Sequence, residues 1–186
     1  MAKKMKLLTA IFAIAFLLLI ILQLYFKRRW LMPYTITAGT FLYHFAMRLA
    51  VGYGINTVFK NEMDYTKKWF KQKPFEEKLF KLLKVKKFKR FAPTYSPETF
   101  DINKKSTEQI IKATCQAEIV HEIIILLSFL PIIASVWLGD FWVFLITSFL
   151  SALFDGWFVI LQRYNRPRLI KLLYFKQKPA YKAINK

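Results

Sequence analysis

The stretch that decides the fold is EIVHEIIILLSFLPIIASVWL, residues 118–138. Its run of about twenty apolar residues is long enough to cross a bilayer as a helix. The run opens with Glu118, His121 and Glu122, which places three ionisable side chains at or just inside a membrane boundary. Such groups persist in spanning segments mainly where they face a cavity, a partner or a substrate. A functional site is therefore expected here.

The composition is that of a small integral membrane protein. The chain has 186 residues, is 55% hydrophobic and carries a formal net charge of +19. Together these values exclude an ordinary soluble domain and a disordered tail. The single cysteine, Cys115, has no partner for an intramolecular disulfide and no neighbour for a zinc knuckle. We expect one all-α membrane domain over residues 1–186, with about four transmembrane helices and amphipathic interfacial helices.

Four apolar segments are expected to span the membrane. They cover residues 7–26, 34–59, 119–138 and 141–161. The first is flanked by basic residues, and its length favours a spanning helix over a cleaved signal peptide. The second contains threonines, glycines, His44 and Arg48, so a re-entrant or interfacial helix is the alternative there. Pro131 predicts a kink in the third span, and the short link Gly139-Asp140 predicts an antiparallel hairpin with the fourth.

Two basic segments accompany these spans. Residues 60–116 form an interfacial segment rich in lysine and aromatic residues, and residues 162–186 form a basic tail. Lysines alternate with apolar residues between positions 75 and 87, which is the composition of a helix lying in the interface plane. Such segments contact membrane lipids through their anionic headgroups. Nucleic acid is not expected as a partner, because no soluble binding domain accompanies the charge.

The basic segments also predict the orientation of the chain. The positive-inside rule makes the richly basic side cytoplasmic, so we expect a multi-pass protein of the cell membrane with both termini in the cytoplasm. The cationic link at residues 27–29 would then lie outside, against the rule. Residues 93–97 contain two prolines and break regular structure. A new helix is expected to begin near Ser106, where Gln109 completes a capping box.

His121 is the candidate general base, since the chain has only two histidines. On a helix, Glu118, His121 and Glu122 project within an arc of about 100°. A carboxylate three residues away can hold the tautomer of an imidazole and raise its basicity, as in catalytic dyads. The alternative is that these side chains only cap the membrane entry. Glu-x-x-His also matches a di-iron ligand pair, but the chain has one copy and two are needed, so no metal is predicted.

A second polar cluster follows the fourth span. Its members are Arg163, Tyr164, Asn165, Arg166 and Arg168. Guanidinium groups suit the recognition of phosphate or carboxylate, which makes these residues candidates for substrate binding. Pro167 predicts that the fourth helix ends near Tyr164, at the headgroup level that Glu118 and His121 should share.

Three further candidates for substrate binding lie within the predicted spans. His44 and Arg48 are four residues apart and share a helix face. Arg48 is expected either to snorkel to the headgroups or to serve the site. Asp155, about two turns inside the membrane, is expected to pair with Arg48 or His44.

Part of the chain resembles a known family. QRYNRPRL at residues 162–169, with AEIVH at residues 117–121 upstream, is similar to the glycosyl-4,4'-diaponeurosporenoate acyltransferase family. Looser similarities occur at Trp69-Phe70, residues 84–89 and Thr114-Cys115. The resemblance covers roughly residues 62–172. It implies an integral membrane enzyme that transfers a fatty acyl chain to a sugar hydroxyl of a glycosylated carotenoid, toward staphyloxanthin-like pigments.

The resemblance also points to particular positions. By motif match these are Glu118, His121, Arg163, Asn165, Arg166 and Arg168. The chain departs from the family pattern at Glu122 and Phe88, where tryptophan is common, and in its apolar segment 34–59. These departures concern the carotenoid substrate more than the reaction type.

We therefore expect a membrane-bound O-acyltransferase in which His121, oriented by Glu118, deprotonates a hydroxyl that attacks an acyl thioester. The arginine cluster, Lys86 and Lys87 would hold donor phosphates or the developing oxyanion. No cofactor is expected; acyl-CoA or another acyl donor is a substrate, and the acceptor is a lipid or glycolipid. The alternatives are a non-catalytic lipid-binding scaffold protein and a metal-dependent membrane enzyme. The sequence leaves the donor, the acceptor and the number of assembled copies open.

Overall fold

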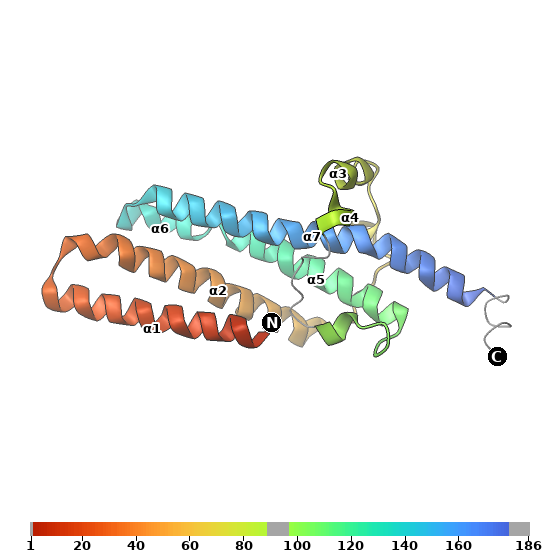
Figure 1. Ribbon diagram of the computed structural model, residues 1–186, viewed down its shortest axis with the longest axis horizontal. Helices are drawn as coiled ribbons and strands as arrows, with labels where there is room; N and C mark the ends of the chain where they lie inside the picture. The colour runs from red at the N-terminus through yellow and green to blue at the C-terminus, as the bar shows by residue number, and fades with distance from the viewer. Residues whose placement is uncertain (1, 89–96, 179–186) are drawn as a thin grey trace. The chain divides into compact units, whose positions relative to one another are not determined.

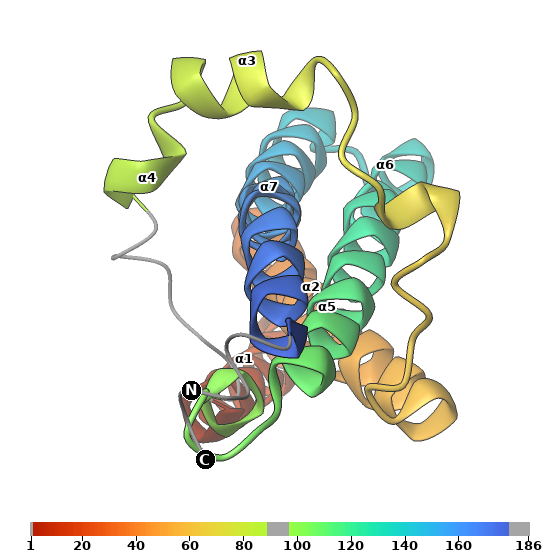
Figure 2. The same ribbon diagram turned by 90° about the vertical axis from the view of Figure 1, so that its right-hand side faces the viewer.

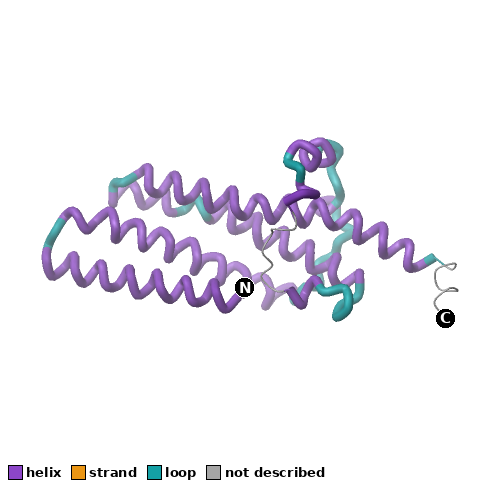
Figure 3. The backbone as a smooth tube through the Cα atoms, viewed as in Figure 1, coloured by secondary structure: helices purple, strands orange, loops and turns teal. Residues whose placement is uncertain are grey.

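The computed structural model describes residues 2–88 and 97–178, and within them every regular element is a helix (Figure 3). The long helices are α1 (Ala2–Phe26), α2 (Met32–Phe59), α5 (Thr107–Leu127), α6 (Pro131–Leu138) and α7 (Phe141–Gln177). The short helices are η1 (Arg29–Leu31), η2 (Lys68–Phe70), α3 (Glu76–Leu82), α4 (Val85–Phe88) and η4 (Pro97–Phe100). The predicted all-α fold class is confirmed.

Three helical stretches are long and apolar enough to cross a membrane. They are Lys3–Phe26, Thr107–Leu138 and Phe141–Gln177, and they contain the first, third and fourth predicted spans. α2 is not among them, because threonines, glycines and two basic side chains interrupt its apolar sequence. Its 28 residues would nevertheless extend about 42 Å as a helix. The second span therefore stays a prediction.

The chain packs as two compact units. The first unit comprises Met1–Gly54 and Glu122–Gly156, and the second comprises Ile55–His121 and Trp157–Lys186. The first unit holds α1, α6 and most of α2, whereas the second holds α3 and α4. α5 and α7 each contribute one part to either unit.

In the first unit, α1 and α2 form an antiparallel hairpin (Figure 1). The ring of Phe12 stacks on Phe41 and Phe45, with centroids 5.2 and 5.5 Å away. Gly39 permits a close approach of the two helices, because a Cβ atom there would lie only 2.7 Å from the ring of Phe16. Aromatic packing around one small residue thus holds the hairpin together, as is common between helices in a bilayer.

The predicted interruption at Pro131 is confirmed, as a break between two helices. α5 ends at Leu127, residues 128–130 form a turn, and Pro131 is the first residue of α6. Proline suits that position because a first-turn residue has no helical partner for its N–H. The link between α6 and α7 is Gly139-Asp140, as predicted, and both residues have positive φ angles.

In the second unit, α5 begins with the predicted capping box. The backbone N–H of Gln109 donates to Oγ of Ser106 at 3.2 Å, and the backbone N–H of Ser106 donates to Oε1 of Gln109 at 3.0 Å. Two N–H groups at the start of the helix are thereby satisfied by side chains. Residues 93–96 of the predicted break lie outside the described residues, and Pro97 begins η4.

The fourth span does not end near Tyr164, which corrects the prediction drawn from Pro167. α7 continues to Gln177 with Pro167 inside it. Proline removes one backbone donor and disfavours helix at the preceding residue. That preceding residue is Arg166, whose side chain makes four hydrogen bonds within the second unit. These tertiary contacts outweigh the local preference.

The lysine-rich stretch between positions 75 and 87 forms two short helices rather than one. α3 ends at Leu82, and Lys84, with φ of 48°, separates it from α4 (Figure 2). Phe80 of α3 and Val85 of α4 are buried in a cluster with Leu161 and Tyr164 of α7. The segment is therefore seated on one part of α7.

Candidate functional site

The centre of the second unit is a carboxylate with no exposed surface. Glu118 lies on α5, and its two oxygens accept hydrogen bonds from two arginines of α7. Oε1 bonds to Nη1 of Arg163, and Oε2 bonds to Nη2 of Arg166. Because the two arginines are three residues apart, they project from neighbouring positions on one face of α7. The three-residue spacing of the two arginines thus lets each of them bind one oxygen of the same carboxylate.

Arg163 also ties a distant loop to α7. Its Nε lies 2.5 Å from Oε1 of Glu76, and its terminal nitrogens donate to the carbonyls of Trp69 and Lys71, each at 3.2 Å. Glu76 is 3% exposed, and its second oxygen accepts from the backbone N–H of Lys73 at 3.2 Å. One guanidinium therefore fixes the loop that precedes α3.

Arg166 is more deeply buried, with 1% of its surface exposed. Its Nε donates to Oγ1 of Thr114, Nη1 donates to the carbonyl of Phe70, and Nη2 donates to the carbonyl of Thr114, each at 3.2 Å. The guanidinium also lies 5.0 Å from the centroid of the Phe70 ring. Every guanidinium nitrogen thus donates to the protein itself.

These four side chains form a balanced network of two carboxylates and two guanidinium groups, which we call the Glu118 network: Glu76, Glu118, Arg163 and Arg166. A buried ion pair has little net effect on stability when it is complete, but removal of one partner leaves an uncompensated buried charge. The two arginines hold internal carboxylates in the structure. To bind donor phosphates, as predicted, Arg163 and Arg166 would have to give up their bonds to these carboxylates.

His121 lies one helical turn beyond Glu118 on α5 and is half-buried. Its ring stacks on Phe158 of α7, with centroids 4.7 Å apart and an angle of 11° between the planes. Stacking covers one face of the imidazole, whereas proton transfer uses the nitrogens at the ring edge. The structure thus brings His121 beside the same helix that carries both arginines. Its orientation by Glu118 stays a prediction.

Three more predicted residues lie on the same part of α7. Tyr164 is 6% exposed, and its ring meets Phe80 edge to face at 5.4 Å. Arg168 is exposed, donates to the carbonyl of Tyr164, and places its guanidinium 3.5 Å from the centroid of that ring. Asn165 is half-buried. Arg168 is therefore the arginine of this cluster that is open to solvent.

Lys86 and Lys87 lie on α4, and both side chains are exposed. Lys89 and Arg90, which continue the same basic run, lie outside the described residues. The exposed lysines of α4 and Arg168 belong to the same unit, and none of the three contributes to the Glu118 network.

The remaining predicted substrate-binding residues form a separate buried set in the first unit. Nη2 of Arg48 lies 2.5 Å from Oδ2 of Asp155 and 2.8 Å from Oγ of Ser151, and Nη1 donates to the carbonyl of His44 at 2.9 Å. The predicted pairing of Asp155 with Arg48 is confirmed. The prediction that Arg48 snorkels to the headgroups is wrong. Its side chain is only 12% exposed, and its guanidinium binds an internal carboxylate and hydroxyl in place of water.

His44 is 4% exposed, and its ring lies 5.5 Å from that of Tyr43. Within the described ranges, neither ring nitrogen of His44 has a hydrogen-bond partner. Glu122, the third predicted catalytic residue, is half-buried and packs as part of the first unit. The predicted site residues are therefore divided between the two units.

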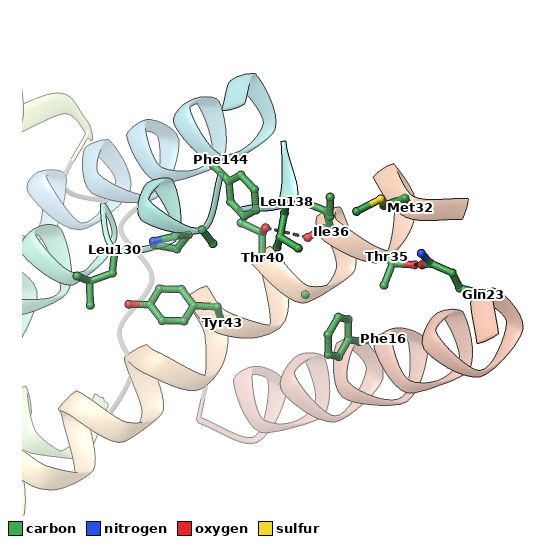
Figure 4. A pocket seen from close by; sticks show the side chains of 13 residues that line it. Phe16, Gln23, Met32, Thr35, Ile36, Thr40, Tyr43, Leu130, Leu138 and Phe144 are labelled. Carbon is green, nitrogen blue, oxygen red and sulfur yellow. Dashed lines mark hydrogen bonds between the residues drawn. The ribbon is translucent and has the colours of Figure 1, made fainter. Parts of the chain in front are cut away.

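The first unit also contains an apolar pocket of about 440 Å³ (Figure 4). Side chains of α1, α2, α6 and α7 line it, among them Phe16, Ile36 and Phe144. Thr40 faces this pocket but donates its hydroxyl to the carbonyl of Ile36 at 2.8 Å. Residues predicted for the site are not part of its lining, so the pocket and the Glu118 network are features of different units.

Two features bear on metal binding and on the single thiol. Across residues 2–88 and 97–178, no group of three or more His, Cys, Asp or Glu side chains is arranged to hold a metal ion. Cys115 is fully buried in a cluster with Met63 and Phe70.

Glu76 is the member of the network that sequence reasoning missed. It sits among lysines, next to Glu77, and looks like part of a solvated face. A signal was nevertheless present, because Glu76, Phe80 and Leu83 fall on one side of a helix. A carboxylate in phase with the apolar face of an amphipathic helix indicates a buried partner, and here that partner is Arg163.

Family comparison covers the helices that carry this network. Residues 66–174 match the model of the glycosyl-4,4'-diaponeurosporenoate acyltransferase family, which is more than half of the chain. The chain belongs to this family. The family's name indicates acyltransferase activity on a glycosyl carotenoid, in agreement with the resemblance seen in the sequence. No curated protein and no solved structure matches the chain.

The matched region contains the whole Glu118 network and the only histidine between its ends, His121. His44 and Arg48 precede the match. The match thus covers parts of both units, and within it lies every member of the Glu118 network.

Proposed function

We propose that this protein is a membrane-bound O-acyltransferase that moves a fatty acyl chain to a hydroxyl of a lipid or glycolipid, with a glycosyl carotenoid as the acceptor. One observation carries the proposal. His121, the only histidine of the family-matched region, lies one helical turn from a carboxylate that is fully buried between two arginines. Helices long enough to cross a membrane suit substrates that are themselves membrane lipids.

His121 acts as the general base in this proposal. An imidazole nitrogen takes the proton of the acceptor hydroxyl as that oxygen attacks the carbonyl carbon of an acyl thioester. The tetrahedral intermediate then collapses, the carbon–sulfur bond breaks, and the imidazolium returns the proton to the departing thiolate. The products are the ester and the free thiol, and the base is regenerated.

The Glu118 network acts as a positioning device. Its charges balance, so it offers no excess positive charge to an anionic donor. Instead it joins α5 to α7 one helical turn before His121, and the stack on Phe158 orients the ring. Holding a catalytic base in one geometry contributes to rate because a small displacement of reacting groups is costly.

The phosphates of an acyl donor would be bound by the exposed cations of the second unit. Arg168, Lys86 and Lys87 are exposed, whereas Arg163 and Arg166 donate to internal acceptors. Arg168 can present a two-nitrogen fork to phosphate, and the lysines can act as point charges.

We further propose that the protein is a multi-pass protein of the cell membrane, with α2 as a fourth span and both termini cytoplasmic. The excess of Lys and Arg in the second unit and the tail supports this orientation. Reporter fusions at the two termini and at the Gly139-Asp140 link should report opposite sides of the membrane. Identical reporter activity at all three positions would contradict the arrangement.

The experiment that tests the function is acyl transfer by the purified full-length protein, with a labelled acyl thioester and a glycosyl carotenoid. His121→Gln keeps a planar polar side chain but removes the base, so kcat should fall by about 10²- to 10⁴-fold. Turnover at the parental level would remove His121 from the mechanism.

A matched control uses the same helix. Leu126→Ala truncates a side chain of α5 that is 73% exposed, and it should leave kcat unchanged. Circular dichroism of both variants shows whether the helices are intact. Equal loss of activity in the two variants would assign the effect to α5 as a whole and not to the imidazole.

A further inference from the structure

We propose that residues 67–87 form a docking surface for anionic phospholipid, in which exposed apolar side chains enter the headgroup layer and lysines bind lipid phosphates. This surface, here called the lysine collar, comprises η2, α3, the start of α4 and the loops between them. It involves binding alone, and its test uses Lys78 and Lys81, which the proposed acyl transfer does not use; Lys86 and Lys87, at its edge, are shared with the proposed donor site.

The collar is seated where the apolar part of α7 ends. Phe80 and Val85 are buried against Leu161, the last residue of the predicted fourth span, and against Tyr164. Glu76 adds the ion pair with Arg163. Packing and charge therefore hold the collar at the level of α7 where hydrocarbon gives way to headgroups.

Large apolar side chains nevertheless point away from this seat. Trp69 is 54% exposed, Phe75 is 59% exposed and Leu82 is 77% exposed. Phe75 and Leu82 are seven residues apart, which puts them within about 20° of each other around the helix. The buried side of α3 carries Glu76 and Phe80, so the exposed apolar stripe is a second face of the same helix. An amphipathic helix lying on a membrane has this arrangement.

The charge of the collar identifies the lipid. Residues 67–87 contain nine lysines and two glutamates. One glutamate, Glu76, is bound to Arg163, and the other, Glu77, lies 3.2 Å from Lys81. The remaining lysines are exposed, and Lys73 lies 5.4 Å above the ring of Trp69. Cations interleaved with apolar anchors fit an anionic bilayer, whereas nucleic acid would use the lysines and leave Phe75 and Leu82 in water.

A fluorophore at Leu82 tests the proposal. Leu82→Cys is labelled with an environment-sensitive dye in the full-length protein, in nanodiscs of phosphatidylcholine with increasing phosphatidylglycerol. The native Cys115 is fully buried, and the labelled parental protein measures any background from it. We expect a blue shift and quenching by brominated acyl chains as phosphatidylglycerol is added. Emission that is the same in neutral and anionic nanodiscs would overturn the proposal.

Two double variants provide a matched comparison. Lys78→Gln with Lys81→Gln removes two collar lysines, one of which pairs with an exposed glutamate at 3.2 Å. Lys104→Gln with Lys105→Gln removes two exposed lysines outside the collar, one of which pairs with Glu98 at 3.8 Å. The collar variant should need at least about fivefold more phosphatidylglycerol for half the spectral change, because each near-surface cation strengthens binding by about that factor. An equal shift in both variants would overturn the collar as a specific surface.

Two further measurements separate this proposal from its rivals. His121→Gln should leave the spectral change intact, since the collar does not depend on catalysis. A short RNA or DNA duplex that displaces phosphatidylglycerol from the labelled protein would show that the lysines serve nucleic acid, against the proposal.

Discussion

The Arg48–Asp155 pair of the first unit and the Glu118 network of the second unit are both buried, but they differ in how completely they are satisfied. Arg48 binds Asp155 and Ser151, while its Nε and both nitrogens of the adjacent His44 have no hydrogen-bond partner in the described ranges. In the network, each guanidinium nitrogen of Arg163 and Arg166 has an internal acceptor.

The difference indicates two uses of buried charge. A closed network specifies one arrangement of the helices that carry it, because any shift leaves several polar groups unpaired. A single pair with unpaired neighbours constrains the packing less and is more easily replaced by apolar residues. The whole network lies inside the family-matched region, whereas of the Arg48–Asp155 pair only Asp155 does. The following variants probe this contrast, from the largest expected effect to the smallest.

Glu118→Gln should have the largest effect on stability. It leaves two buried guanidinium groups facing a neutral amide, and breaking a buried pair in this way costs about 3–5 kcal/mol. Unfolding in detergent, followed by circular dichroism, measures the change. Glu108→Gln is the control, since Glu108 lies on the same helix and is exposed, and its partner Lys112 is half-buried. Equal stability of the two variants would contradict a central role for Glu118.

Arg166→Lys should lower the free energy of unfolding by roughly 2–3 kcal/mol, since an ammonium can replace the bond to Glu118 but not the three bonds to Thr114 and Phe70, each worth about 1 kcal/mol. The same unfolding assay applies. Arg168→Lys, an equal exchange at an exposed position, should change stability by less than about 0.5 kcal/mol. If Arg166→Lys is as stable as the parental protein, a positive charge at this position is enough to stabilise the network.

Asp155→Asn should cost about 2 kcal/mol, less than Glu118→Gln, because Arg48 keeps its bonds to Ser151 and to the His44 carbonyl. Adding Arg48→Met should restore most of the lost stability, as expected when both charges of a buried pair are replaced. A double-mutant cycle measures this recovery. If the double variant is no more stable than Asp155→Asn, Arg48 is as necessary in the first unit as the arginines of the Glu118 network are in the second.

Ser106→Ala should have the smallest effect, about 1 kcal/mol, through loss of the cap that starts α5. Ser106→Gly should cost only a few tenths of a kcal/mol, since glycine leaves the first N–H groups open to water. Hydrogen exchange at the first turn of α5 separates the two. Equal protection in both variants would mean that the Glu118 network, and not the cap, holds this end of the helix.

Local patterns predicted the parts of the structure that depend on local physics. The apolar runs, the capping box at Ser106 and the interruption at Pro131 were all readable, because each follows from hydropathy or from backbone donors within a few residues. The pairing of Arg48 with Asp155 was also predicted, since a charge in an apolar segment needs a partner and few candidates existed. The end of the fourth span was wrong for the opposite reason, as contacts of Arg166 override the preference of Pro167.

The amino-acid sequence by itself determined that the chain is helical, that it has helices long and apolar enough to cross a membrane, and that it carries one histidine beside a carboxylate in its family-matched region. Each of these properties depends on residues that are close together in the sequence. Only the tertiary structure decided that Glu118 binds Arg163 and Arg166, that Glu76 joins them from a lysine-rich segment, and that Phe158 covers the ring of His121. Such choices depend on which side chains meet when α3, α5 and α7 pack, and a buried charge selects its partner by geometry across the fold.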